Sequence, residues 1–273
     1  MNFLKQPYIA FRAYFDAVLL MFRTFMWLTF LVPLLLGIGM YFGGEVLMDH
    51  FRDLDPSALK EEDGSQFLLV GLQAILIYMM YHMNKYMVLT LMTPILTPLS
   101  ERTEYHLTGN KYPLIFKYYI EDVVRAFKII LRNMLLQMIW MALIYTVTFI
   151  YGLPGWINDV CYYLIAFYFY GFSFMDYASE RRRISIAEAI KFTRRHFLVA
   201  FFLGGIYVGM YSIPYAGVVI APILSVVAGT VAVHYLIDLS DNPYAVKEGQ
   251  EEKGYKRRET GDVVEVEVEV EGE

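Results

Sequence analysis

Ionisable side chains that lie within or beside long apolar runs are the first candidates for chemistry in this sequence. Six residues meet this description: His82, Lys85, Asp159, Asp176, His234 and Asp238. A charge costs several kcal/mol in hydrocarbon, so such residues commonly mark an ion or substrate pathway. We favour a snorkelling role for Lys85, whose long stem reaches the interface, over a place in a pathway. Asp159, His234 and Asp238 are expected near helix ends, where water or lipid headgroups solvate them.

The densest positive charge lies between Phe172 and His196 and separates two apolar regions. Its cations follow one apolar run or precede the next: Arg181, Arg182, Arg183, Lys191, Arg194 and Arg195. Lys and Arg beside membrane segments are retained on the cytoplasmic side, so this stretch predicts a cytoplasmic collar. Ser185 and Glu188 form a capping-box pattern, which predicts a helix that begins here and carries cations in its last turn.

A small group at the start of this collar is a candidate gate. Asp176 is four residues from Glu180 and close to Arg181. One interpretation is a salt bridge at the helix end between Asp176 and Arg181 or Arg183. The other is contact with a transported substrate. We assign Asp176, Glu180 and Arg181 to the collar or gate.

No enzyme or metal motif accompanies these residues. The sequence contains no HExxH, P-loop, GxSxG, paired CxxC or dinucleotide fingerprint. The five histidines fall on different expected elements, and the single cysteine, Cys161, cannot form an intrachain disulfide. The cations lie in clusters beside apolar segments, which is no signature of nucleic-acid binding. We therefore expect neither an enzyme nor a bound metal or cofactor.

Composition places the chain in a lipid bilayer. Hydrophobic residues make up 57% of the 273 residues and charged residues 19%, which is too apolar for a soluble domain of this length. We predict an all-α integral membrane protein with a membrane domain over 1–240. Residues 241–273 change abruptly to charge and glycine and predict an acidic disordered tail. Strand pairing by the alternating Val and Glu run from Val264 is the less favoured alternative.

About six apolar helical segments are expected in the membrane domain, after an interfacial amphipathic helix over 8–23. The alternative for 8–23 is a cytoplasmic extension of the first span. Residues 24–43 and 67–99 are predicted as long spans, and the second exceeds a bilayer core, so it must tilt, kink or protrude. Thr97–Pro98 predict the start of a new helix that ends at Gly109–Asn110.

The remaining apolar segments pair into two hairpins, over 133–177 and 197–238. Leu153-Pro154-Gly155 is predicted to turn the first hairpin and Ile213-Pro214 the second. Hydrophobic periodicity leaves open whether the hairpins cross the bilayer fully or penetrate only partway.

Six stretches occur in an order typical of one known family. They are Tyr14-Phe15 before LVPLLLG, MTPILTPLSERTEYHLTG from Met92, EDVVRAF from Glu121, IYGLPGW from Ile150, MDYASERRRISIAEAIKFTRRH from Met175 and YSIPYAGVVIAPILSVVAGT from Tyr211. Over about residues 10–238 the chain resembles the etoposide-induced membrane protein superfamily, which includes the bacterial CysZ sulfate permeases. The acidic tail lies outside the resemblance.

This resemblance implies an all-helical, multi-pass protein of a bacterial-type inner membrane, assembled as a homo-oligomer. It also implies two long spanning helices, hairpins that penetrate partway, and sulfate uptake. The charge pattern adds an orientation, because 44–66 is acidic while the segment from 99 to 133 carries a second basic collar. Both termini are therefore expected in the cytoplasm.

The chain departs from the sulfate-transporting branch at one place. In that branch a glycine-hydrophobic-arginine motif precedes the first-span proline, and here the corresponding residues are Phe25-Met26-Trp27-Leu28. Arg23, or secondarily Arg12, would then supply the cation that attracts the anion. We predict a membrane permease for sulfate or a related small anion. The alternative is a non-transporting membrane scaffold that recruits partners through its basic collars and acidic tail.

Overall fold

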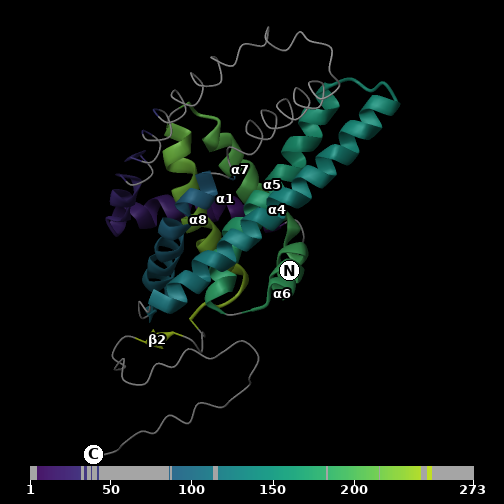
Figure 1. Ribbon diagram of the computed structural model, residues 1–273. Coiled ribbons are helices and arrows are strands. Elements are labelled where there is room, and N and C mark those ends of the chain that lie inside the picture. The colour runs from purple at the N-terminus through teal and green to yellow at the C-terminus, as the bar shows by residue number, and fades with distance from the viewer. Residues whose placement is uncertain are drawn as a thin grey trace, which may run out of the picture.

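The computed structural model describes residues 5–31, 34–35, 38, 42, 86, 88–112, 116–182, 184–214, 216–240 and 245–247 (Figure 1). The elements are α1 (Gln6–Arg23), the 3-10 helix η2 (Met26–Phe30), a helix over 88–108, β1 (Asn110–Lys111), α4 (Phe116–Ile150), α5 (Trp156–Arg181), α6 (Ile186–Arg195), α7 (Phe197–Tyr211), α8 (Ala216–Leu236) and β2 (Val246–Lys247). The prediction of an all-α protein is confirmed.

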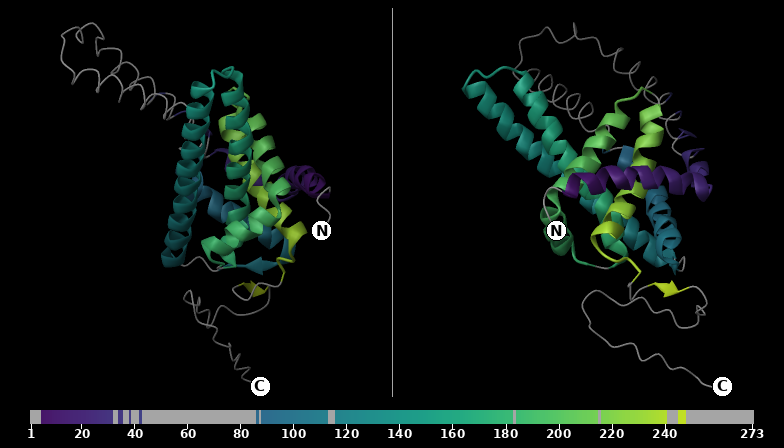
Figure 2. Two further views of the ribbon diagram at one scale, coloured as in Figure 1. Left: turned by 90° about the vertical axis from the view of Figure 1, so that its right-hand side faces the viewer. Right: turned by 180° about the vertical axis from the view of Figure 1, so that it is seen from behind.

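Two helical hairpins, α4–α5 and α7–α8, pack against each other through α5 and α7, and the turn of the first projects beyond the other described elements (Figure 2). A turn containing Gly152, whose φ of 59° is left-handed and suits glycine, joins α4 to α5. A turn containing Pro214 joins α7 to α8. Both predicted hairpins are confirmed, but α4 begins earlier than the predicted position 133. Residues 116–132 contain neither Gly nor Pro, so nothing in them interrupts the helix.

Helices α5 and α7 pack with their backbones in close contact. A Cβ atom on Gly171 would lie 1.7 Å from the Ala200 carbonyl oxygen, and one on Gly204 would lie 1.8 Å from the Phe167 carbonyl oxygen. A side chain fits at neither position, so these two glycines set the distance between the two helices.

Helix α1 runs across α7 and α8 instead of along them (Figure 2). Tyr14 anchors it, because its hydroxyl donates to the Leu203 carbonyl oxygen at 2.9 Å and lies 2.6 Å from Ser225 Oγ. The outer face of α1 carries exposed aromatic side chains: Tyr8, Phe11, Phe15 and Phe22. The predicted helix over 8–23 is confirmed, and its exposed apolar face is typical of an interfacial helix.

The helix over 88–108 runs through both of its prolines, so the predicted new helix at Thr97–Pro98 is wrong. Pro98 has no N–H to offer the Pro94 carbonyl oxygen four residues earlier. That oxygen accepts a hydrogen bond of 2.6 Å from the Tyr119 hydroxyl of α4 instead. A contact from a neighbouring helix thus replaces the missing backbone bond, and the helix continues.

Strands β1 and β2 form an antiparallel pair in which Asn110 lies opposite Lys247. β1 follows Gly109, whose φ of 77° ends the preceding helix where the sequence predicts. The β2 strand (Val246–Lys247) falls in the segment predicted as a mostly disordered tail and pairs with β1. The rest of 241–273, apart from Ala245, lies outside the described residues.

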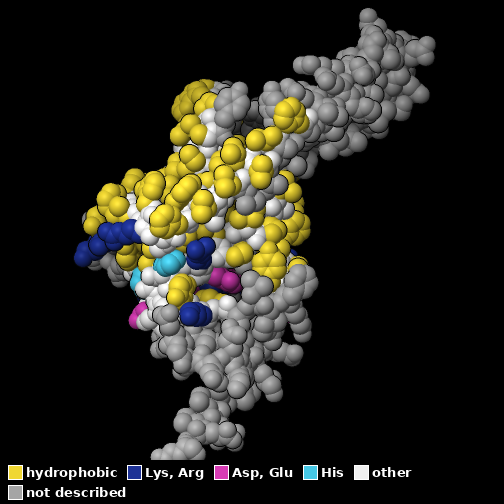
Figure 3. Space-filling view, turned by 90° about the vertical axis from the view of Figure 1, so that its left-hand side faces the viewer, with side chains coloured by type: hydrophobic (Ala, Val, Ile, Leu, Met, Phe, Trp, Pro, Cys, Tyr) yellow, Lys and Arg dark blue, Asp and Glu magenta, His cyan; other side chains and the backbone are white. Residues whose placement is uncertain are grey.

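Two described helices are long and apolar enough to cross a bilayer: 32 residues of α4 (Tyr119–Ile150) and all 21 residues of α8. Helix α7 has 15 residues, about 22 Å, and is shorter than the hydrocarbon core. In Figure 3 hydrophobic side chains cover the upper part of the surface and charged ones gather below. These features are those of a membrane protein. Of the predicted span 24–43 the structure describes 24–31, 34, 35, 38 and 42, and this stretch contains the 3-10 helix η2. Of the predicted span 67–99 it describes only 86 and 88–99.

Helix α6 begins with the predicted capping box. The Glu188 N–H donates to Ser185 Oγ at 3.3 Å, and the Ser185 N–H donates to Glu188 Oε2 at 2.9 Å. Hydrogen bonds from the Ser185 backbone and hydroxyl hold the pKa of Glu188 below its ordinary value. The last turn of α6 carries Arg194 and Arg195, as predicted.

Replacing Ser185 by alanine is expected to destabilise α6 by about 1 kcal/mol, because an N-cap acceptor is lost. The helix should then open about fivefold more often. Trypsin cleavage after Lys191 in reconstituted protein measures this opening. Ser185→Asp keeps an N-cap acceptor and should be cleaved at the wild-type rate, whereas equal rates for all three proteins would contradict the prediction.

Candidate functional site

A band of polar side chains is buried between α4 and α5, and we call it the polar seam. Its members are Asp122, Arg125, Asn133, Gln137, Ser173, Asp176 and Glu180. All except Arg125 are at most 7% exposed. Polar and ionisable groups inside a membrane protein are costly and mark substrate or ion pathways. The polar seam is therefore the candidate functional site.

Helical periodicity aligns these residues. On α5, Ser173, Asp176 and Glu180 follow one another at intervals of three and four residues and share one face. The α4 members lie at intervals of three, eight and four residues, close to whole helical turns. From Asp122 to Gln137 the seam covers about 22 Å of helix.

An ion pair lies within the seam. Arg125 Nη2 is 3.3 Å from Asp176 Oδ1, and Arg125 Nη1 donates to the Ile184 carbonyl oxygen at 2.7 Å. The two side chains are 19% and 4% exposed, so water screens their attraction less than that of a surface pair. This pair ties α4 to α5 and to the segment that precedes α6.

Neutral groups continue the seam. Asn133 Nδ2 donates to Ser173 Oγ at 2.9 Å, and the Ser173 hydroxyl donates to the Phe169 carbonyl oxygen at 3.1 Å. One turn further along α4, Gln137 Oε1 accepts a hydrogen bond of 2.6 Å from the Tyr86 hydroxyl. Amide and hydroxyl groups both donate and accept, so this part of the seam can exchange hydrogen bonds without a permanent charge.

Buried tyrosines extend from the Gln137 end of the seam. Ring centroids lie 4.5 Å apart for Tyr86 and Tyr170, and 5.0 Å apart for Tyr170 and Tyr207. Tyr170 and Tyr207 are fully buried, and in the described part of the chain neither hydroxyl has a hydrogen-bond partner. A buried donor without an acceptor costs about 1–3 kcal/mol. These two hydroxyls are therefore available to a ligand that accepts hydrogen bonds.

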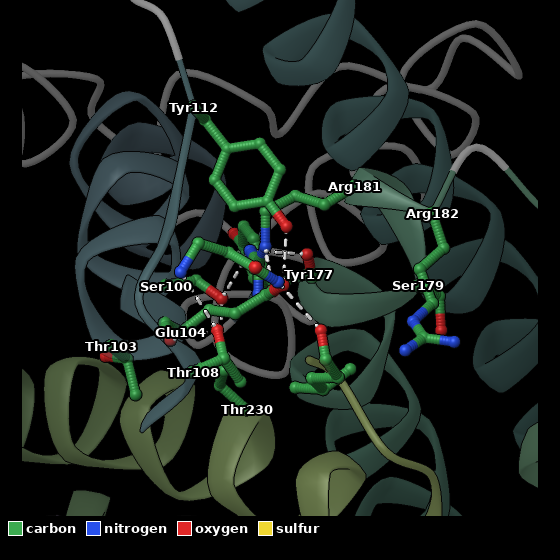
Figure 4. A network of polar contacts seen from close by, with 12 residues as sticks. Ser100, Thr103, Glu104, Thr108, Tyr112, Tyr177, Ser179, Arg181, Arg182 and Thr230 are labelled. Carbon is green, nitrogen blue, oxygen red and sulfur yellow. Dashed lines mark hydrogen bonds and ion pairs between the residues drawn. The ribbon is translucent and has the colours of Figure 1, made fainter. Parts of the chain in front are cut away.

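Arg181 leaves α5 on another face and forms a second charged cluster (Figure 4). Its Nε donates to Glu104 Oε2 at 2.5 Å, and its Nη1 donates to Ser100 Oγ at 2.9 Å. Ser100 Oγ lies 2.6 Å from Thr230 Oγ1 of α8, and the Tyr112 hydroxyl donates to Glu104 Oε1 at 2.5 Å. The cluster joins α5, α8 and the helix before β1.

The Glu104 carboxylate is stabilised in its ionised form. Burial acts to raise the pKa of Glu104, but the charge of Arg181 and hydrogen bonds from Tyr112 and Arg181 outweigh burial and lower it. The Glu104 and Arg181 side chains are 1% and 4% exposed. The cluster thus holds a buried ion pair with several further hydrogen bonds.

Glu180 has the opposite environment. It lies beyond the apolar segment 157–177, is 3% exposed, and neither of its carboxylate oxygens has a hydrogen-bond partner among the described residues. Burial, followed by the nearby charges of Asp122 and Asp176, raises the pKa of Glu180 well above its ordinary value, and the nearby arginines offset this in part. Glu180 therefore holds a proton at pH values where an exposed glutamate is ionised.

The structure brings the predicted gate residues to one end of α5: Asp176, Glu180 and Arg181. The predicted salt bridge between Asp176 and Arg181 is wrong. Asp176 pairs with Arg125 and Arg181 pairs with Glu104, because five residues of helix turn the two side chains to different faces. Arg183 lies outside the described residues.

The two residues predicted to attract the anion lie on α1, away from the seam. Arg12 is exposed, with Nε 3.5 Å from Asp16 Oδ2 and Cζ 5.3 Å from the Tyr235 ring centroid. Arg23 is exposed in the last turn of α1, where a cation interacts favourably with the helix dipole. Neither residue is a member of the seam.

The seam residues that were not predicted as site residues are Asp122, Arg125, Asn133, Gln137 and Ser173, and Glu104 of the Arg181 cluster was not predicted either. A polar stripe at helical spacing along 116–137 would have revealed the four on α4, but the predicted helix start at 133 divided that stripe. Of the other ionisable candidates, Asp159 and Asp238 are exposed near helix ends, as predicted. His82 and Lys85 lie outside the described residues.

The fold and the seam together define the class of protein. Membrane-length helices that enclose a buried polar path are the architecture of a membrane transport protein. The chain belongs to the family described as Sulfate transporter CysZ/Etoposide-induced protein 2.4, whose model matches residues 10–222. This match confirms the resemblance seen in the sequence. No curated protein and no solved structure matches the chain.

Proposed function

We propose that this protein is a permease for sulfate or a chemically related small anion, with the polar seam as part of its path. The observation that carries the proposal is the seam itself, which continues into the buried hydroxyls of Tyr170 and Tyr207, neither of which has a hydrogen-bond partner among the described residues. An oxyanion that leaves water needs hydrogen-bond donors in place of its hydration shell. Membership of the sulfate transporter family supports the same substrate class.

The charges of the seam suggest that uptake is coupled to protons. The seam contains three carboxylates, of Asp122, Asp176 and Glu180, and one guanidinium, of Arg125. An anion that enters is repelled by the carboxylates unless they are neutralised. In our proposal Glu180 carries a proton while the anion passes and releases it on the side of higher pH.

Radiolabelled sulfate uptake into proteoliposomes tests the path. Asn133→Leu keeps the size of a buried side chain but removes the donor to Ser173, and we expect uptake to fall about tenfold. Leu135→Ala changes a side chain on the same helix that is 49% exposed, and it should transport at the wild-type rate. Wild-type uptake by Asn133→Leu would remove the seam from the path. Failure of folded wild-type protein to exceed protein-free liposomes would contradict the permease itself.

Glu180→Gln tests proton coupling. We expect sulfate uptake by the wild-type protein to become faster as the external pH is lowered from 8 to 6. Glutamine resembles the protonated acid, so uptake by the variant should not depend on pH in this range. The measurement is the ratio of initial sulfate uptake rates at these two pH values. Glu188→Gln on exposed α6 is the matched control and should keep the wild-type ratio. If Glu180→Gln showed the same ratio of uptake rates as the wild-type protein, Glu180 would be excluded as the coupling group.

The proposed setting is a bacterial-type inner membrane, with several crossings, both termini in the cytoplasm, and assembly as a homo-oligomer. Arg23 and Arg12 stay predictions for attracting the anion. The scaffold alternative also stays a prediction, because nearly all of its acidic tail lies outside the described residues.

A further inference from the structure

A pocket of about 800 Å³ lies beside the seam, between α4, α5 and the ends of α6 and α7. One part of its wall is apolar and includes Leu136, Trp140 and Leu164. Trp140 is 53% exposed and Leu164 47% exposed, so this wall reaches the outer surface of the hairpin. A pocket of this size suits an organic ligand or part of one.

The polar part of the wall is basic. Arg132, Arg194 and Tyr168 all line the pocket, and the positive charges of the two arginines act on each other and on the Tyr168 hydroxyl. Arg132 Nη1 donates to the neighbouring Asn133 Oδ1 at 3.3 Å. Neither arginine has an ion pair with a carboxylate among the residues that the structure describes. Two guanidinium groups that have no carboxylate partner in the described part of the chain create a site for a phosphate or another oxyanion.

The position of Arg132 along α4 indicates the depth of the pocket. Ile150 follows Arg132 by 18 residues, about 27 Å of helix and close to the thickness of a hydrocarbon core. If Ile150 ends the apolar part of α4 at one interface, Arg132 lies at the other. Leu136 and Trp140 follow Arg132 at one and two helical turns on the same face, inside the hydrocarbon.

We propose that this pocket binds one anionic phospholipid of the bilayer. The phosphate lies between the Arg132 and Arg194 guanidinium groups, and an acyl chain lies along Leu136, Trp140 and Leu164. A free inorganic anion would satisfy the arginines but leave the apolar wall uncovered. The combination of paired cations at the interface and an apolar wall directed into the hydrocarbon fits an amphipathic anion.

Native mass spectrometry of the full chain, released from mixed micelles of phosphatidylglycerol and phosphatidylcholine with identical acyl chains, tests the proposal. The wild-type protein should retain one phosphatidylglycerol in preference to phosphatidylcholine. Arg132→Gln with Arg194→Gln should weaken this retention about 30-fold, or about fivefold for each guanidinium. The control, Lys191→Gln with Arg195→Gln, removes the same charge from exposed positions of α6 outside the pocket and should retain the lipid.

A second double variant, Arg132→Lys with Arg194→Lys, keeps both charges. It controls for the case in which the glutamine variant loses the lipid because it is misfolded. It should retain phosphatidylglycerol better than the glutamine pair and less well than wild type, because lysine does not bind phosphate in a bidentate manner. Millimolar inorganic phosphate should not displace the lipid. Equal retention by wild type and the glutamine pair, equal binding of phosphatidylcholine, or displacement by inorganic phosphate would each overturn the proposal.

Discussion

Replacing Gly171 by alanine is expected to lower the free energy of unfolding by about 3 kcal/mol or more. The new Cβ would meet the Ala200 carbonyl oxygen at 1.7 Å and the Ala200 carbonyl carbon at 2.5 Å. Overpacking commonly costs about 1–3 kcal/mol, and here the obstacle is backbone, which cannot rotate away as a side chain would. Helices α5 and α7 would have to separate, and the seam and the pocket beside them would be disturbed.

Thermal unfolding in detergent, followed by circular dichroism, measures this loss. Gly204→Ala should lower the melting temperature in the same way, since its Cβ would lie 1.8 Å from the Phe167 carbonyl oxygen. Gly209→Ala is the matched control on α7, because no atom of another described element lies within 4 Å of its added Cβ. The free energy of unfolding of this control variant should rise by up to about 1 kcal/mol, because alanine has a higher helix propensity than glycine. A wild-type melting temperature for Gly171→Ala would show that the helices do not pack as described.

Replacing Glu104 by glutamine is expected to destabilise the protein by about 3–5 kcal/mol, because the buried Arg181 charge loses the carboxylate to which its Nε donates. Only 4% of the Arg181 side chain is exposed, so water cannot substitute for the carboxylate. The Tyr112 hydroxyl would still find an oxygen acceptor on the glutamine, which confines the loss mainly to the ion pair. The same unfolding measurement in detergent gives the magnitude.

The double variant Glu104→Gln with Arg181→Met separates charge from packing. Removing both charges should restore part of the stability that Glu104→Gln loses, since no uncompensated charge remains. Acid provides an independent check. The pKa of Glu104 is lowered in the folded protein, so its stabilising contribution is complete above the unfolded pKa and is lost as the pH falls through the folded pKa. A double variant less stable than Glu104→Gln would contradict the assigned role of the pair.

The hairpins were predictable because their signals are local. Pro and Gly in the turns near 154 and 214 interrupt apolar runs, and the Ser185 and Glu188 pair starts α6 by contacts within one helical turn. Each of these signals acts over a few residues and needs no knowledge of the rest of the fold. The family resemblance was readable for a similar reason, since it rests on short stretches in a fixed order along the chain.

Contacts between distant segments were less predictable. Pro98 looks like a helix start until the Tyr119 hydroxyl is known to satisfy the Pro94 carbonyl oxygen. Asp176 looks like a partner for Arg181, which is five residues away, until α4 brings Arg125 to it. In both cases the decisive group comes from another helix, and sequence spacing does not show which faces meet.

Apolar content, turn residues and the positions of Lys and Arg thus determined an all-α membrane protein with two hairpins, because lipid demands internally hydrogen-bonded helices whatever their neighbours are. Tertiary structure alone decided how the seam is assembled and which charges pair. It decided too that Glu180 has no hydrogen-bond partner among the described residues. The reason is physical: the electrostatic environment of a buried carboxylate depends on the groups that other helices place around it.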